Sequence, residues 1–328
     1  MVTYSQEKEH AAPSGGAEEF LTALLDRAYD DGDRTALETV QNRLAALHAK
    51  SFEIPQEHTG FKGLGDDLDE ALRIEERMLA HEDRFIDLEG FEGAEDGGQE
   101  FVRRLKKVVR EHPANRHPFY LTYLPEQASV ADIAFYLAQE SALDPRFDDF
   151  IALMQIGMPV GPKLELAANY WDEMGNGAFP RVHTVMFQDA LDEVGATPEY
   201  IASHQIVEAT VCGNLSALFA LRRPLIHRAI GSFAVTEFLF PRRCSQLLEA
   251  WERNGLSAKG HEYHREHVGV DARHASGFFK NVITPLVDAS PAVAGEVYRG
   301  ALARLNSSQR YLDRILTRLT DGTERGEK

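Results

Sequence analysis

The sequence has little cysteine and no long apolar segment, and both shortages exclude classes of protein. It contains two cysteines in 328 residues, Cys212 and Cys244, so it can build neither a disulfide framework nor a Cys-x-x-Cys metal site. We therefore expect a reducing, cytoplasmic environment. No apolar segment approaches the roughly 20 residues that a membrane-spanning helix needs, so we expect a soluble protein without a membrane partner.

Positive charge is also scarce. The chain carries 35 lysines and arginines against 52 aspartates and glutamates, a formal net charge of −17. Such a surface repels nucleic acid and anionic membranes, so neither is expected as a partner. A small cationic or neutral substrate suits this charge better than an anionic one.

Alternating strand patterns are missing from the sequence, and helical periodicity dominates it. The sequence therefore predicts an all-α protein. The expected helices span residues 17–30, 34–49, 66–82, 99–112, 128–142, 161–175, 181–194, 197–219, 221–254, 257–284 and 290–319. Residues 1–16 lack the basic and apolar regions of a signal peptide, and residues 320–328 are polar, so both segments are expected to be tails.

A glycine- and acid-rich segment, residues 87–100, is the most loop-like part of the interior sequence. We expect it to separate accessory, dimer-forming helices over residues 17–98 from one main bundle over residues 99–319. We expect the whole chain to fold as one compact unit and to form a homodimer. A separate N-terminal domain is the alternative.

Residues 261–279, "HEYHREHVGVDARHASGFF", contain an unusual concentration of histidine. In a helix, His267, Asp271 and His274 lie at positions i, i+4 and i+7 and project within about 60° of one another. This face is either a set of metal ligands or an ordinary solvated stripe.

Three further side chains of metal-ligand type fall on apolar helix faces: Glu140, His183 and Glu237. An unpaired buried charge costs several kcal/mol, and a bound metal ion is one way to compensate it. The alternatives are a carboxylate at the edge of the stripe or paired with arginine, for which Arg242 and Arg243 are the candidates at Glu237, and a hydrogen-bonded core histidine.

Glu173 precedes His183 by ten residues. Glycines at 175 and 177 and Pro180 indicate that one helix stops and another starts between them. Such a break can direct both side chains to one point, whereas an exposed acid beside an interhelical turn is the simpler interpretation.

Together these positions supply four carboxylates and three imidazoles. Four negative charges balance two divalent ions, and mixed histidine and carboxylate ligation is typical of redox-active non-haem iron, whereas structural zinc favours thiolates and calcium or magnesium favours oxygen ligands. The residues therefore predict a dinuclear iron site, and manganese fits the same ligands.

The ordered motifs resemble the haem-oxygenase-like diiron oxidases and oxygenases, the iron-containing redox enzymes. The resemblance rests on "AQESALDPRF", "NYWDEMGNG…VHTVMF", "TEFLFPRR" and the H-x3-D-x2-H pattern "HVGVDARH", and spans roughly residues 118–290. Ferritin-type bundles use paired E-x-x-H motifs, but here Glu7 and His10 form such a pair only in the N-terminal tail. Haem oxygenase itself needs an early axial histidine and no carboxylate cluster, so it fits poorly.

The resemblance implies a haem-oxygenase-like bundle that holds two iron ions, uses O2 as co-substrate and takes electrons from an external donor. It implies the ligands Glu140, Glu173, His183, Glu237, His267, Asp271 and His274. Glu173 resembles the additional ligand of the N-oxygenating branch, which includes 2-aminoimidazole N-oxygenases; the alternative is an acid that only orients His183.

We therefore expect an N-oxygenase of specialised metabolism that converts a small amine, guanidine or aminoimidazole nitrogen toward a hydroxylamine, nitroso or nitro product. One alternative is an oxidative desaturase or carbon–carbon lyase acting on a fatty acid or an amino acid. Another is a helical metal-binding protein without catalysis. Aromatic side chains expected near the pocket are Tyr136, Tyr170, Trp171 and Phe233.

Overall fold

The computed structural model describes residues 15–55, 60, 63–89, 91 and 93–321. Every regular element within these residues is helical, which confirms the predicted all-α class. The chain divides into two compact units, Met1–His81 and Glu82–Lys328. None of the described helices has both the length and the apolar character required to cross a bilayer. Most of the predicted tails, residues 1–14 and 322–328, lie outside the described residues.

The first unit contains helices α1 (Gly15–Tyr29), α2 (Arg34–Phe52) and most of α3 (Leu64–Asp83). The Asp33 side chain caps α2 by accepting a hydrogen bond from the Ala36 amide, which satisfies a backbone donor in the first turn. A buried pair, His48 Nε2 and Glu75 Oε1 at 2.8 Å, joins α2 to α3.

The second unit is a larger helical bundle. Its α-helices are α4 (Gly98–Glu111), α5 (Leu124–Glu126), α6 (Val130–Glu140), α7 (Phe147–Met154), α8 (Val160–Glu173), α9 (His183–Val194), α10 (Pro198–His204), α11 (Val207–Leu221), α12 (Ile226–Arg253), α13 (Glu262–Gly277), α14 (Thr284–Ala289) and α15 (Ala294–Thr320). Short 3-10 turns join several of them, and a π-helical turn, Phe278–Ile283, follows α13.

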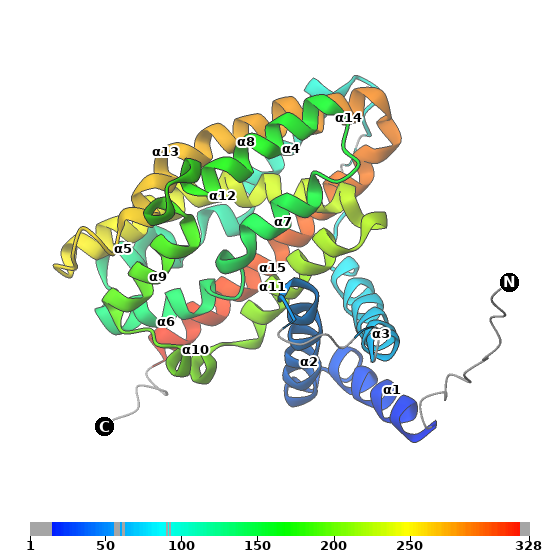
Figure 1. Ribbon diagram of the computed structural model, residues 1–328, viewed down its shortest axis with the longest axis horizontal. Coiled ribbons are helices and arrows are strands. Elements are labelled where there is room, and N and C mark those ends of the chain that lie inside the picture. Colours follow the sequence, from blue (N-terminus) through cyan, green and yellow to red (C-terminus); the bar gives the residue numbers. More distant parts are fainter. Residues whose placement is uncertain (1–14, 56–59, 61–62, 90, 92, 322–328) are drawn as a thin grey trace, which may run out of the picture. The chain divides into compact units, whose positions relative to one another are not determined.

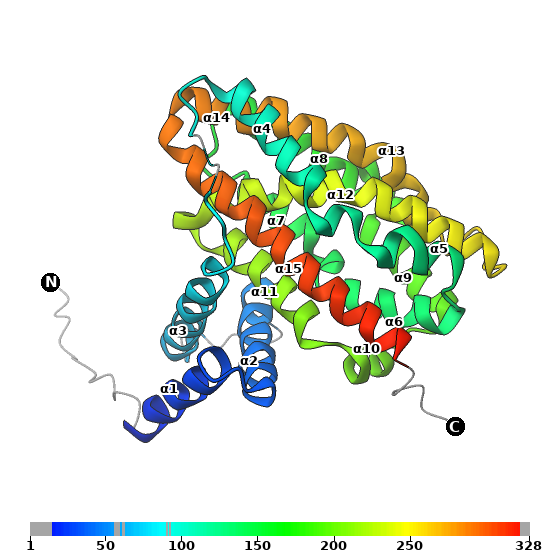
Figure 2. The same cartoon turned by 180° about the vertical axis from the view of Figure 1, so that it is seen from behind.

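Helix α12 lies at the centre of this bundle, between α13 and α15 (Figures 1 and 2). Two glycines allow α12 and α15 to pack backbone against backbone. A Cβ at Gly231 of α12 would lie 1.9 Å from the Val297 carbonyl oxygen, and a Cβ at Gly300 of α15 would lie 2.0 Å from that of Arg228. No side chain fits at either position, so glycine is required there.

The predicted stop and restart after Glu173 is confirmed: α8 ends at Glu173 and α9 begins at His183. Asn176 has φ 53° and its neighbours Gly175 and Gly177 also have positive φ, so the chain turns sharply at this point. The turn places the two residues on adjoining helix ends.

Several sequence-based assignments differ from the structure. The helix predicted over 197–219 is two helices, because the buried Gln139 side chain holds the break: its amide donates to the His204 carbonyl, and its carbonyl accepts from the Ile206 amide. Helix α7 was not predicted. The division between the two units falls after His81, at the end of α3, whereas the predicted boundary was residue 98; Glu82 pairs with Arg310 and Asp83 pairs with Arg228 in the second unit.

Candidate metal centre

Of the seven predicted ligands, the structure describes six side chains, all in the second unit. They lie at the ends of α6 (Glu140) and α8 (Glu173), at the start of α9 (His183), in α12 (Glu237) and along α13 (His267 and His274). Asp271 is a residue of α13, but its side chain lies outside the described part of the chain. All six described side chains are buried.

Glu173, His183 and His267 form the centre of the site. One ligand atom from each lies within 4.8 Å of the others, although the residues come from three helices. Glu173 Oε2 approaches His183 Nδ1 to 2.6 Å, yet this nitrogen makes no hydrogen bond of good geometry within the described residues. The two atoms are close, but an N–H on this nitrogen would not point at the oxygen. Such an arrangement fits two ligands of one metal ion better than a hydrogen bond.

Glu237 and His274 adjoin this group. Glu237 Oε2 lies 3.6 Å from His274 Nδ1, and the Asn169 amide donates to Glu237 Oε1 at 2.6 Å. On the other side of the imidazole, His274 Nε2 lies 2.9 Å from Asp172 Oδ2. The carboxylate and the imidazole are therefore each held by a further polar side chain, as is common around metal ligands.

The backbone determines which nitrogen of His267 is free. Its Nδ1 lies 2.6 Å from the Tyr263 carbonyl oxygen, which can only accept a hydrogen bond, so Nδ1 carries the proton. Burial, together with the nearby His183, holds the pKa of His267 well below its usual range. The imidazole is therefore neutral, with Nε2 available as a metal ligand.

The pKa values of the other ionisable groups at the site depend on their charged neighbours as well as on burial. Burial raises the pKa of Glu173, an effect that His183 opposes. Burial lowers the pKa of His274, but Glu237 and Asp172 outweigh it and raise that pKa to about 9. Without metal, His274 thus carries a proton between carboxylates, and a divalent ion would replace this proton on binding.

A small cavity opens onto the cluster. Its volume is about 20 Å³, and its lining residues are Phe147, Glu173, Thr236, Glu237, Phe240, Tyr263 and His267. This is space for one water molecule. Of the aromatic residues predicted near the pocket, Trp171 is exposed, whereas Phe233 packs behind the lining residue Phe147.

Glu140 does not belong to the group formed by Glu173, His183 and His267. Its carboxylate accepts a 2.5 Å hydrogen bond from the Tyr311 hydroxyl. Tyr120 and Tyr136, whose hydroxyls are 2.9 Å apart, and the buried Arg243 complete this second polar cluster. Arg243, one of the two arginines that sequence analysis considered as partners for Glu237, thus lies with Glu140 instead.

Sequence analysis missed three polar residues near the site. They are Asn169, described above, Asp172 and Asp148. Asp172 precedes Glu173 and contacts His274, a residue 102 positions later. Asp148 lies in the first turn of the unpredicted helix α7; burial raises its pKa, and the charge of His183 partly opposes this effect. Adjacency to Glu173 was the only sequence signal for Asp172.

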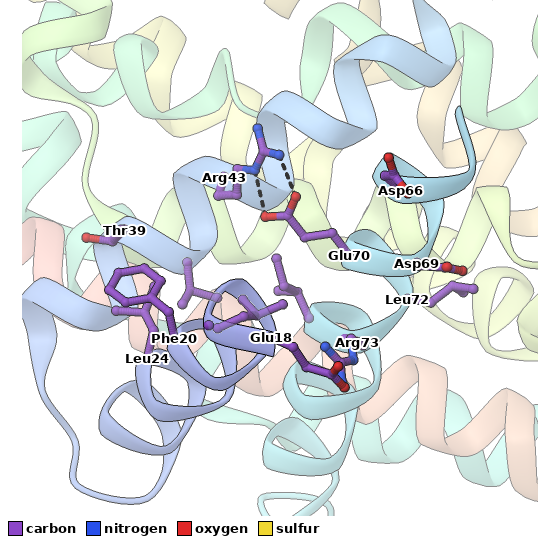
Figure 3. A pocket seen from close by; sticks show the side chains of 14 residues that line it. Glu18, Phe20, Leu24, Thr39, Arg43, Asp66, Asp69, Glu70, Leu72 and Arg73 are labelled. Atoms are coloured by element: carbon purple, nitrogen blue, oxygen red, sulfur yellow. Dashed lines mark hydrogen bonds and ion pairs between the residues drawn. The ribbon is translucent and has the colours of Figure 1, made fainter. Parts of the chain in front are cut away.

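A larger cavity of about 1090 Å³ lies in the first unit, among α1, α2 and α3 (Figure 3). Its lining combines apolar side chains such as Phe20 and Leu72 with acid–base pairs, including Arg43 and Glu70. Among the described residues that line it there is no histidine or cysteine. The candidate metal centre is therefore the cluster in the second unit.

Comparison with known proteins agrees with this placement. The model of a family described as iron-containing redox enzymes matches residues 134–309, an interval that contains all seven predicted ligands. A 4-chloro-allylglycine synthase from Streptantibioticus cattleyicolor is 24% identical over 233 residues, which are 66% of this chain and 83% of that protein.

Two solved structures share the fold. A TenA homologue from Pseudomonas syringae has a TM-score of 0.52 at 11% identity, over 67% of this chain and 92% of its own. A domain of unknown function with a haem-oxygenase-like fold, from Shewanella denitrificans, has a TM-score of 0.50 at 15% identity, over 71% of this chain and 94% of its own. The predicted haem-oxygenase-like bundle is confirmed.

Proposed function

The chain belongs to the family of iron-containing redox enzymes, and from this premise we propose that it is a non-haem diiron, O2-dependent N-oxygenase of small amines. The observation that carries the proposal is the buried convergence of Glu173, His183 and His267, with Glu237 and His274 beside them. Mixed imidazole and carboxylate ligands suit redox-active iron.

The proposed ligands fall into two groups. Glu173, His183 and His267 would hold one ion, and Glu237 and His274 the other, with Asp271 supplied by the same helix as His274. Iron, when bound, supplies the electrons and open coordination positions that activate dioxygen. The predicted ligand role of Glu140 is the weakest of the seven, because Tyr311 already occupies its carboxylate.

The protein's own contribution is to hold the ligands, exclude bulk water and orient the amine. Burial of the cluster keeps the site dry, which strengthens every charge interaction inside it. Phe147, Phe240 and Tyr263 form an apolar wall on the cavity. The carboxylates of Glu173 and Glu237 reach the same cavity, where they favour a cationic or neutral amine over an anion.

The charge of the cavity lining favours a nitrogen compound over an acid, because the carboxylates of Glu173 and Glu237 reach it. The volume of about 20 Å³ does not choose between substrates, since an amine and an acyl chain both require rearrangement of the lining. A small amine, guanidine or aminoimidazole, oxidised at nitrogen toward a hydroxylamine, nitroso or nitro product, is therefore the proposed substrate class.

One observation favours a second candidate, oxidative cleavage or desaturation of an amino acid. The matched relative from Streptantibioticus cattleyicolor is named for an unsaturated amino acid, 4-chloro-allylglycine. An amino acid is also a small amine, so the carboxylates of Glu173 and Glu237 would suit its amino group as well. The two candidates differ in whether oxygen is inserted at nitrogen or a carbon–carbon bond is broken.

The remaining parts of the proposal concern the surroundings of the enzyme. We propose a cytoplasmic homodimer that takes electrons from an external reductant and binds neither nucleic acid nor membrane. The formal charge of −17 supports the last two points.

The test is anaerobic loading with Fe(II), followed by mixing with O2 in a stopped-flow spectrometer. We expect a transient visible absorption band whose decay is accelerated by the amine that is the substrate, and mass spectrometry of the product then separates the two candidates. Acceleration by fatty acids but not by amines would overturn the proposal. If neither iron binding nor oxygen consumption occurs, a metal-binding or structural role without catalysis replaces it.

A further inference from the structure

Two adjacent carboxylates at the end of α8 contact two histidines from different helices. Glu173 Oε2 lies 2.6 Å from Nδ1 of His183, the first residue of α9. Asp172 Oδ2 lies 2.9 Å from Nε2 of His274, in α13. The last turn of α8 therefore contacts one imidazole from α9 and one from α13.

Asp172 is itself held in place. Its other oxygen, Oδ1, accepts a 2.9 Å hydrogen bond from the Asn176 side-chain amide. Asn176 has φ 53°, a left-handed conformation that asparagine tolerates better than most residues. Because the side chain of Asp172 is 28% exposed, it keeps contact with water and does not face the dry cavity directly.

The contact with Asp172 decides how His274 presents its ring. A carboxylate accepts hydrogen bonds, so Nε2 of His274 carries a proton. The other nitrogen, Nδ1, points toward Glu237, whose Oε2 is 3.6 Å away and whose Oε1 is fixed by Asn169. If a metal ion replaced the Nδ1 proton, this nitrogen and the Glu237 carboxylate would be the groups placed to hold it.

We propose that Asp172 is a positioning residue that orients His274 and fixes its tautomer, and thereby sets the affinity of the ion shared by His274 and Glu237. The inference rests on the proposed function, since it assumes that His274 is a ligand. Carboxylates behind ligating histidines typically contribute 10- to 100-fold to metal affinity.

The experiment is an anaerobic Co(II) titration of the full chain, followed by visible absorption and by the number of ions bound. Asp172→Ala is expected to weaken one of two equivalents by 10- to 100-fold and to change the ligand-field bands of that ion. Asp172→Asn keeps an acceptor oxygen without the charge, so it should fall between the wild type and Asp172→Ala. If Asp172→Ala does not fold, Asp172→Asn alone tests the role of Asp172.

The chain offers a matched control. Asp313 Oδ1 lies 3.0 Å from Nε2 of the buried His117, the same type of contact in the same bundle. Asp313→Ala should leave both Co(II) equivalents and their spectrum unchanged. A merely structural role for Asp172 predicts that both alanine variants lower the stability of the metal-free protein and that neither changes the Co(II) spectrum.

The two possible failures can be distinguished. If the wild type binds two Co(II) ions and Asp172→Ala binds them with the same affinity and spectrum, the role of Asp172 is wrong and the proposed function stands. If the wild type binds no Co(II), the proposed function fails first.

Discussion

The histidines of the site have different protonation states although they lie within one cluster. His267 is neutral because it is buried and lies near His183, whereas His274 is charged because two carboxylates flank it. A metal ion would therefore displace a proton from His274 on binding, but none from His267. The acid–base state of each ligand follows from its immediate partners, not from its residue type.

The first prediction concerns Glu140. Because the Tyr311 hydroxyl holds its carboxylate, we expect Glu140→Gln to keep the number of bound metal ions and to destabilise the protein by about 1–3 kcal/mol, the usual cost of weakening a buried charged hydrogen bond. Glu173→Ala, in contrast, should lose one ion. Metal analysis after anaerobic loading and urea unfolding of the metal-free protein measure the two effects.

Tyr311→Phe is the control, since it removes the same hydrogen bond from the other side. It should destabilise the protein without changing metal content. If Glu140→Gln loses a metal ion, Glu140 is a ligand as the sequence motif suggests, and Tyr311 holds it only in the metal-free protein.

The second prediction concerns pH and His264, which lies 4.9 Å from Tyr263 and 6.4 Å from Trp251 between ring centroids. Burial lowers the pKa of His264 to about 3. In the unfolded chain this imidazole binds a proton near pH 6.5, whereas in the folded chain it does so only near pH 3. The free energy of unfolding therefore decreases as the pH falls from 6.5 to 3. From pH 6.5 to 5, the loss attributable to His264 is roughly 2 kcal/mol.

The measurement is urea unfolding of the chelated protein at several pH values. His264→Phe removes the titrating group, so its stability should decline by about 2 kcal/mol less over this range than that of the wild type. Parallel declines would show that His264 is protonated in the folded state.

Sequence alone could predict the burial of His183 and Glu237, because each falls on an apolar helix face. It could not identify Asp172, whose partner His274 is 102 residues away. For Glu140, helical periodicity correctly predicted burial. Burial alone does not identify the residue that contacts the side chain. Choosing between Tyr311 and a metal ion requires the packing of α6 against α15.

At the level of helices, periodicity located the long elements and failed at short or interrupted ones. Helix α12 was predicted over 221–254 and spans Ile226–Arg253, because a long apolar face leaves a strong signal. Helix α7 has eight residues, too few to show a clear period. The break between α10 and α11 depends on a side chain from α6, so it is a tertiary effect that a local pattern does not contain.

The third prediction tests that break. Gln139 satisfies the His204 carbonyl and the Ile206 amide, which are otherwise left without these partners in a part-buried region. Gln139→Ala is therefore expected to cost about 2–4 kcal/mol of unfolding free energy, measured in urea. Gln188→Ala removes an amide that bonds Asp192 on an exposed face and should cost less than about 0.5 kcal/mol. Equal effects would contradict a role for Gln139 in holding the break.

The fourth prediction concerns the contact of α12 with α15. Gly231→Ala forces a methyl group to within 1.9 Å of the Val297 carbonyl oxygen, so the helices must separate, and a loss of at least about 3 kcal/mol is expected. Gly161→Ala, in α8, meets no atom within 4 Å and should be neutral or stabilising by up to about 1 kcal/mol. Thermal unfolding of both variants decides the matter; a stable Gly231→Ala protein would show that the helices can move apart at little cost.

For the whole molecule, the division into two units separates metal chemistry from the N-terminal helices. Every described residue of the candidate metal centre belongs to the unit Glu82–Lys328. The first unit has its own core, with Leu44, Ile74 and Met78 fully buried. Metal binding should therefore stabilise the second unit directly, because its site exists only in the folded bundle.

The fifth prediction follows from this separation and uses hydrogen exchange of the full chain with and without Mn(II). At a free metal concentration 100 times the dissociation constant, the folded bundle gains about 2.7 kcal/mol, so amides of α8, α9, α12 and α13 that exchange through global opening should slow by up to about 100-fold. Amides of α1 and α2 provide the internal control and should keep their rates. Equal slowing in both units would mean that they unfold together, and unchanged rates in α13 would mean that His267 and His274 hold no metal.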